Sequence, residues 1–257
     1  MKLPSKLFTF ALFVSFLVFS PLTASAFSIQ PALQDISLDP GQEFQGKLSI
    51  VNDQRIPQNF HISIQKFIPQ GDSGQQIFLE GDDRSGLPEW MRLERDILRL
   101  DPHARGVVKW TVNVPLNARP GGYYVAIFVA ASTDGTEDGP VPLLARIGML
   151  LFVRVNGNVS PNFTVKDFFS SEKSLRRLPV KLTAVISNHG NVHGLPDGKV
   201  EIRNLFGKIV KIIPLNLEKV RVLPDSEHRI SIVWQDEVQG EGSGFFSEVI
   251  EEWRNFG

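Results

Sequence analysis

Residues 100–130, LDPHARGVVKWTVNVPLNARPGGYYVAIFVA, contain the pattern that decides the fold. From Val107 to Val114, apolar residues alternate with mostly polar ones, as in a strand with one buried face. Residues 118–122, ARPGG, are turn formers. The run from Tyr123 to Ala131 is apolar at nearly every position, which fits a strand buried on both faces. The stretch therefore predicts strand, turn and strand in an antiparallel β-sandwich.

Similar short runs, separated by turn residues, fill the chain from residue 27 onward. The first, Ser28–Leu38, is predicted as one strand with a kink at Pro31. The other strands predicted before Asn156 bring that part to roughly eight or nine strands, the spacing of a sandwich; they are 44–52, 60–67, 76–79, 90–93, 96–100, 107–114, 123–131 and 144–155. About five more strands follow, at 163–169, 180–188, 198–204, 208–214 and 228–234.

We therefore predict an all-β protein with two tandem immunoglobulin-like β-sandwiches. The first spans residues 27–156, a small polar linker spans 157–162, and the second spans 163–235. About five strands are fewer than the seven or so of an immunoglobulin-like sandwich, so the second sandwich is expected to lack its closing strands.

Residues 1–26 have the pattern of a signal peptide. Lys2 and Lys6 precede an apolar run from Leu7 to Phe19, and Ala24-Ser25-Ala26 supplies a small-residue cleavage site. We expect cleavage after Ala26 and an extracytoplasmic protein that is secreted or associated with the cell envelope. An uncleaved segment would instead hold the chain at a membrane.

The last stretch, residues 236–257, changes period. After a glycine-rich lead-in at 240–244, apolar residues fall at helical spacing, which predicts a short amphipathic helix; they are Phe245, Phe246, Val249, Ile250, Trp253 and Phe256. Two interpretations stay open. Either this helix closes the second sandwich, or the chain is a fragment and the missing strands or a membrane anchor follow it.

Composition excludes several classes of function. The net charge is -1, which gives no reason to expect a nucleic-acid partner. The chain has no cysteine, which excludes a thiol nucleophile, a disulfide framework and a thiolate metal site. An exported chain of this kind must hold its fold by packing alone.

A short pattern recurs three times before a predicted strand. It reads Leu38-Asp39-Pro40-Gly41, Leu100-Asp101-Pro102-His103 and Leu223-Pro224-Asp225-Ser226. The recurrence fits related sandwich units. Chance repetition of a turn that contains proline and aspartate is the alternative.

Candidate metal ligands are few. His189 and His193 are four residues apart, a spacing that metal sites use on a helix, but Gly190, Asn191 and Gly194 predict a turn and no third ligand is near in sequence. We expect solvated loop histidines, and we take His61, His103 and His228 as isolated. The acidic stretches 134–139 and 80–83 do not match a calcium-binding loop, so solvated turns are expected there.

Catalytic patterns are missing as well. The chain has no nucleophile elbow, H-E-x-x-H motif or phosphate-binding loop. Carboxylate pairs for sugar hydrolysis stay open, because such partners meet only in the fold. Tryptophans at 90, 110, 234 and 253 could stack on sugars, but three of the four lie in or beside alternating strands, where a core position is expected. Asn158 and Asn162 match glycosylation acceptors that we interpret as inert linker residues. We expect no catalytic, cofactor-binding or metal-ligating residue, and the ligand-binding residues stay unknown.

Three segments resemble a known family. They are 38–41 (LDPG), 49–52 (SIVN) and 114–123 (VPLNARPGGY), and they are similar to the first domain of WxL-interacting proteins of bacterial cell envelopes. The same pattern resembles pilus-chaperone-like and other immunoglobulin-like adhesion modules. The resemblance covers roughly residues 27–234. It implies an envelope protein whose first domain binds peptidoglycan and whose second domain binds protein partners.

These observations predict a non-catalytic binding or scaffold protein of the bacterial cell envelope. Its expected partners are a cell-wall polymer or envelope surface proteins, and neither nucleic acid nor a cofactor. Two alternatives stay open. A carbohydrate-binding accessory module of a larger secreted enzyme would show exposed coplanar aromatic residues in a groove, and a secreted hydrolase would show convergent buried carboxylates in a cleft.

Overall fold

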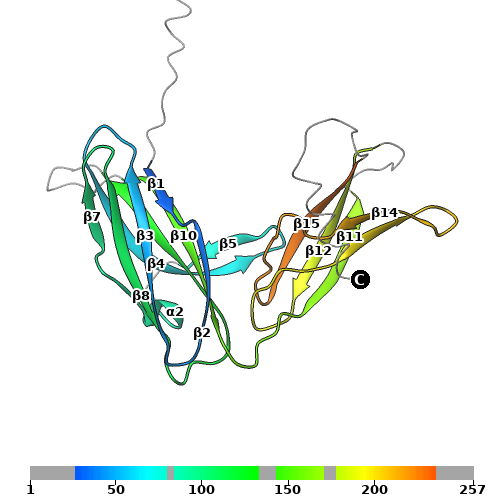
Figure 1. Cartoon of the computed structure of the whole chain (residues 1–257), viewed down its shortest axis with the longest axis horizontal. Coiled ribbons are helices and arrows are strands. Elements are labelled where there is room, and N and C mark those ends of the chain that lie inside the picture. The colour runs from blue at the N-terminus through cyan, green and yellow to red at the C-terminus, as the bar shows by residue number, and fades with distance from the viewer. Residues whose placement is uncertain (1–26, 80–83, 133–142, 171–177, 236–257) are drawn as a thin grey trace, which may run out of the picture. The chain divides into compact units, whose positions relative to one another are not determined.

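The computed structural model describes residues 27–79, 84–132, 143–170 and 178–235, and their regular secondary structure is almost entirely β-strand (Figure 1). The predicted signal peptide, the acidic stretches 80–83 and 134–139 and the predicted C-terminal helix lie outside the described residues. No helix among the described residues is long and apolar enough to cross a membrane. The all-β prediction is confirmed.

The chain divides into two compact units. The first contains the described residues up to Lys66 and those within Glu80–Asn117 and Tyr124–Val153. The second contains Phe67–Leu79, Ala118–Tyr123 and the described residues from Arg154 onward. The second unit is thus built from segments that lie far apart in the sequence.

Two sheets comprise the strands before residue 156. One has the order β1-β3-β8-β6, with β1 at Phe27–Gln30, β3 at Glu43–Asn52, β8 at Arg105–Asn113 and β6 at Met91–Leu93. The other has the order β2-β10-β9-β4-β5, with β2 at Leu33–Leu38, β10 at Leu143–Val155, β9 at Gly121–Ser132, β4 at Gln58–Gln70 and β5 at Gln75–Phe78. β7, at Ile97–Leu100, also pairs with β4.

Burial follows the alternation in the sequence. On β8, Val108, Trp110 and Val112 are buried, and the alternate residues Val107 and Lys109 are exposed. β9 is buried at every residue from 125 to 132, so it is covered on both faces. Both predictions from residues 100–130 are confirmed.

Two strand predictions were wrong. Ser28–Leu38 is not one strand but two, β1 and β2, which lie in different sheets. Pro31 separates them and has no backbone N–H to continue a ladder. The predicted strand from Trp90 to Leu93 begins too early, because Leu87–Trp90 is a short helix, α2, with a proline in its first turn, and only the three residues of β6 follow as strand.

The turn before β9 contains a residue with positive φ, as its two glycines predict. Gly121 has φ 156°, and a Cβ there would lie 3.1 Å from the carbonyl oxygen of Asn191. The next amide, that of Gly122, donates a hydrogen bond of 2.8 Å to the same oxygen. Glycine is therefore needed at 121 both for its backbone angle and for this close approach.

The second unit has a three-stranded and a two-stranded sheet. β11 (Phe163–Ser170), β12 (Val180–Asn188) and β15 (Ser226–Trp234) lie side by side in that order, and β13 (Lys199–Arg203) pairs with β14 (Ile209–Pro214) (Figure 1). All five predicted strands are present. Their apolar faces enclose a core that consists of Val180, Leu182, Ala184, Ile186, Ile213, Val222, Ile230 and Ile232.

Candidate functional site

The two histidines at metal-site spacing do not form a metal site. His189 is exposed, but His193 is only 2% exposed, so the prediction of two solvated histidines was wrong for His193. The reason is that the chain turns inward after Asn191, and Val192 and His193 are both buried. Among the described residues, no group of three or more histidine and acidic side chains could hold a metal ion.

The described tryptophans do not offer a surface for sugars. Trp110 is fully buried, Trp90 is half-buried, and Trp234 packs against the core of the second unit. Trp253 lies outside the described residues. The exposed aromatic side chains of the described residues are phenylalanines instead, namely Phe168, Phe169 and Phe206.

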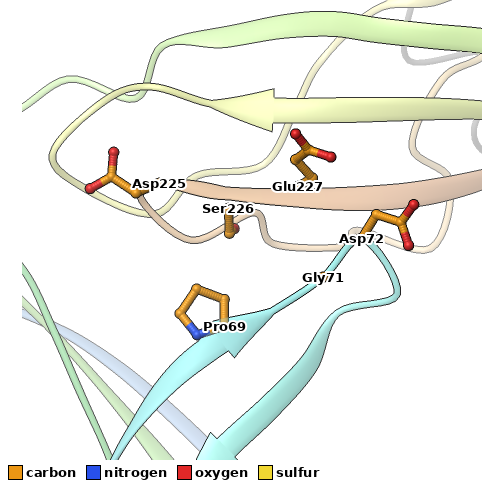
Figure 2. Close-up of a pocket in the computed structure, with 6 residues that line it drawn as sticks. All are labelled: Pro69, Gly71, Asp72, Asp225, Ser226 and Glu227. Atoms are coloured by element: carbon orange, nitrogen blue, oxygen red, sulfur yellow. The ribbon is translucent and has the colours of Figure 1, made fainter.

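One shallow pocket of about 520 Å³ lies in the second unit, between the turn after β4 and the start of β15. Its lining residues are Pro69, Gly71, Asp72, Asp225, Ser226 and Glu227. Figure 2 shows Ser226 directed toward the β4–β5 turn, and the carboxylates of Asp225 and Glu227 directed away from it. The three carboxylates of the pocket therefore do not converge on one point.

The polar groups of this pocket have structural partners. Arg229 donates from Nε to Asp72 Oδ2 over 2.8 Å, and its backbone N–H donates to the Asp72 carbonyl over 2.7 Å. The Oγ of Ser226 donates to the Leu223 carbonyl over 2.7 Å. A nucleophilic serine instead requires an adjacent general base, so this geometry does not support a hydrolase.

The contacts of His228 were not predicted from the sequence, which suggested an isolated histidine. It is not isolated, because Ser73 forms a β-bridge with it and a Cβ on Gly74 would lie 1.9 Å from its ring. Burial lowers the pKa of His228 below its usual value. The signal in the sequence was the glycine pair at 71 and 74, which permits a tight turn but does not say what the turn contacts.

The sheet edge at β11 is the more distinctive surface. Among the described residues, β11 pairs only with β12, so its other edge faces outward. Val165 and Phe168 pair in register with Ile186 and Ala184, both core residues. Paired residues project to the same face of a sheet. Val165 and Phe168 therefore lie on the inner, apolar face, yet they are 60% and 47% exposed.

The position of the second sheet explains this exposure. β14 contacts β15, which is the strand at the opposite edge of the three-stranded sheet from β11. Only the first residue of β11, Phe163, packs against the core. The ladder shifts register between Val165 and Asp167, and the intervening Lys166 reaches Glu227 on β15 with an Nζ–Oε1 distance of 2.5 Å. The described residues therefore leave the inner face of β11 uncovered at Val165 and Phe168.

The comparisons with known proteins give a likeness in fold. No family model and no curated protein matches the chain. A class 5 fimbriae chaperone, CfaA, is similar at 13% identity and a TM-score of 0.48, covering 84% of this chain and 95% of its own. The CsuC–CsuE chaperone–subunit complex of Acinetobacter baumannii gives 13% and 0.41 over 79% and 89%, and the E. coli chaperone DraB gives 14% and 0.40 over 80% and 83%.

At these identities and TM-scores, the likeness concerns the fold and says nothing of what this chain binds.

Proposed function

We propose that this chain is a non-catalytic, extracytoplasmic binding protein of the bacterial cell envelope, and that its second unit binds an extended apolar segment of a partner protein along β11. The observation that carries the proposal is the outward edge of β11, where Val165 and Phe168 extend the inner face of the sheet without a cover. The extracytoplasmic location rests on the signal-peptide pattern of residues 1–26.

An added strand would pair with the outward backbone groups of this edge and would cover its exposed apolar side chains. Backbone N–H and C=O groups along the outer side of an edge strand pair readily with another strand, and alternate side chains of that strand then enter apolar pockets. Beyond the bulge at Lys166, the strand continues regularly through Phe168 and Phe169. Pairing there would place apolar side chains of the incoming segment next to Phe168, over the open end of the core.

A cell-wall polymer fits this edge less well. Sugars are held by flat exposed aromatic rings together with precisely placed polar groups. The exposed inner face of β11 offers Val165 and one phenylalanine instead. Peptidoglycan binding, which the family resemblance implies for the first sandwich, is therefore tested separately, in a parallel arm of the experiment described below.

Peptides with alternating apolar and polar residues are the probe. We expect wild-type protein to bind some of them, with slower amide exchange along β11, and we expect Phe168→Asp to weaken binding about tenfold or more. Ile97→Asp is the matched control, because Ile97 is a half-exposed apolar residue on another short strand, β7. Proline at a peptide position that donates to β11 should abolish binding.

Three results would contradict the proposal. They are no peptide binding, equal binding by the wild type and Phe168→Asp, or protection that falls on strands other than β11. Isolated cell walls form the parallel arm. Retention of the wild type and Phe168→Asp in equal amounts on cell walls, without peptide binding, would favour the cell-wall function instead.

A further inference from the structure

The turn between β13 and β14 is firmly closed by its own hydrogen bonds. Asn204 Oδ1 accepts from the backbone N–H groups of Phe206 and Lys208, each over 3.0 Å. The Asn204 N–H donates to the Lys208 carbonyl over 2.9 Å, and the Gly207 N–H donates to the Asn204 carbonyl over 2.9 Å. Gly207 has φ 76°, which suits glycine. The shape of this tip is therefore specified by the sequence.

Two large apolar side chains occupy the tip that these bonds fix. Leu205 is 102% exposed and Phe206 is 94% exposed, the highest values among the exposed large apolar residues described. Figure 1 shows the hairpin that contains β14 projecting from the rest of the second unit. Val210 and Ile212, further along β14, are about half exposed as well. Adjacent exposed apolar side chains on a rigid projection mark an interaction site.

Basic residues surround this apolar tip. Residues 199–211 contain four cations, Lys199, Arg203, Lys208 and Lys211, and one carboxylate, Glu201, for a net charge of +3 in a chain whose total is -1. Glu201 is held by Arg203 at 2.5 Å and by Lys199 at 3.2 Å. Arg203 also donates from Nη1 to the Gly207 carbonyl over 3.1 Å, which keeps its charge beside the tip.

We propose that the β13–β14 hairpin is a membrane-contact site that inserts Leu205 and Phe206 into the interface of an anionic lipid bilayer. Apolar side chains that enter the boundary between headgroups and acyl chains, flanked by lysine and arginine at the headgroups, are the combination that binds such surfaces. The cations around the tip favour an anionic lipid surface over an apolar pocket on a protein. An apolar pocket on a protein would satisfy Leu205 and Phe206 but would give Lys208 no role.

This site is independent of the proposed function at β11. The two surfaces lie on different sheets of the second unit, and they use different residues and different ligands. Residues 236–257 are the same in every variant below, and residues 1–26 are either kept in all of them or removed from all of them, so each comparison is between chains that differ only at the named residues.

The first test is co-sedimentation of the full chain with vesicles of phosphatidylcholine alone and of phosphatidylcholine with phosphatidylglycerol. We expect the double variant Leu205→Ser/Phe206→Ser to partition about tenfold less than the wild type onto the anionic vesicles. Lys208→Glu should weaken binding to anionic vesicles only, and added salt should do the same. Leu116→Ser is the matched control, because Leu116 is 86% exposed and lies in the first unit.

The second test locates the contact. Because the chain has no cysteine, Phe206→Cys accepts a single environment-sensitive fluorophore, and Leu116→Cys accepts the same label as a control. The label at 206 should report an apolar environment on anionic vesicles, and the label at 116 should not. The proposal is wrong if the label at 206 is unresponsive, if the double variant binds like the wild type, or if neutral vesicles bind equally well. If the hairpin docks on a protein instead, the label at 206 should be unresponsive to vesicles.

Discussion

At the scale of single residues, Trp110 shows how one side chain shapes its neighbours. It lies directly opposite Gly46 on β3, and a Cβ at that position would lie 2.0 Å from the indole ring. Phe44 packs against the same ring with a centroid distance of 5.7 Å. Because Gly46 has no side chain, the indole of Trp110 occupies the space where one would lie. The pattern of β8 predicts that Trp110 is buried, but no local pattern predicts which glycine makes room for it.

Trp110→Ala should lower the free energy of unfolding by about 3–5 kcal/mol, because it removes a fully buried aromatic side chain. Trp110→Phe should cost less, since Nε1 has no hydrogen-bond partner among the described residues and the smaller ring forfeits no such bond. Denaturant unfolding of the three proteins measures this. Equal midpoints for the wild type and Trp110→Ala would mean that the indole faces solvent.

At the scale of elements, two of the three occurrences of the recurrent turn pattern, at residues 100–103 and 223–226, lie next to the same hydrogen-bond arrangement. Asn52 ends β3 and Asn188 ends β12, and both are buried. Each accepts at Oδ1 from the backbone N–H two residues later and donates from Nδ2 to the carbonyl four residues later. Each also donates to the turn before the next paired strand, Asn52 to the Leu100 carbonyl and Asn188 to the Val222 carbonyl. This shared network favours related sandwich units over chance recurrence.

Asn188→Ala should lower the free energy of unfolding by roughly 3 kcal/mol or more, because it leaves several buried backbone groups without partners at about 1–3 kcal/mol each. Asn52→Ala should have a similar effect. Asn191→Ala is the control. It also removes side-chain hydrogen bonds, to Asn158 and Ser160, but it is exposed and water replaces them. A loss at Asn188 no larger than that at Asn191 would contradict the structural role of the network.

Strand positions could be predicted from the sequence to within a few residues, because alternation reports which side of a strand is buried. Sheet membership could not. Ser28–Leu38 has one continuous pattern, yet its halves β1 and β2 pair with β3 and β10. The exposure of the inner face of β11 could not be predicted either. Val165 and Phe168 have the pattern of inward residues, and their exposure depends on where a separate sheet lies.

At the scale of the whole molecule, the second unit joins segments from distant parts of the chain. Arg229 and Asp72 are 157 residues apart in sequence and form an ion pair with an Nη2–Oδ2 distance of 2.6 Å. Neither position has a sequence signal for the other, because an exposed acidic turn and a basic strand residue are common. The contact also brings His228 against Ser73 and Gly74, so a titratable group lies in the seam between the segments.

This seam predicts a pH dependence of stability. Burial lowers the pKa of His228 in the folded protein, so the unfolded chain binds more protons near and below its ordinary value of about 6.5. The free energy of unfolding should therefore be highest above that pH and should fall as the pH drops through 6.5 and then through the lower folded value.

Unfolding free energies of the wild type and His228→Gln, measured from neutral to mildly acidic pH, isolate this contribution. The wild type should lose more stability than His228→Gln over that range, because the variant cannot take up the proton. Amide exchange should locate the loss at residues 67–79 and at the start of β15. His189→Gln, which replaces an exposed histidine of the same unit, is the matched control. Parallel pH profiles for the wild type and His228→Gln would show that His228 is protonated as readily in the folded protein as in the unfolded chain.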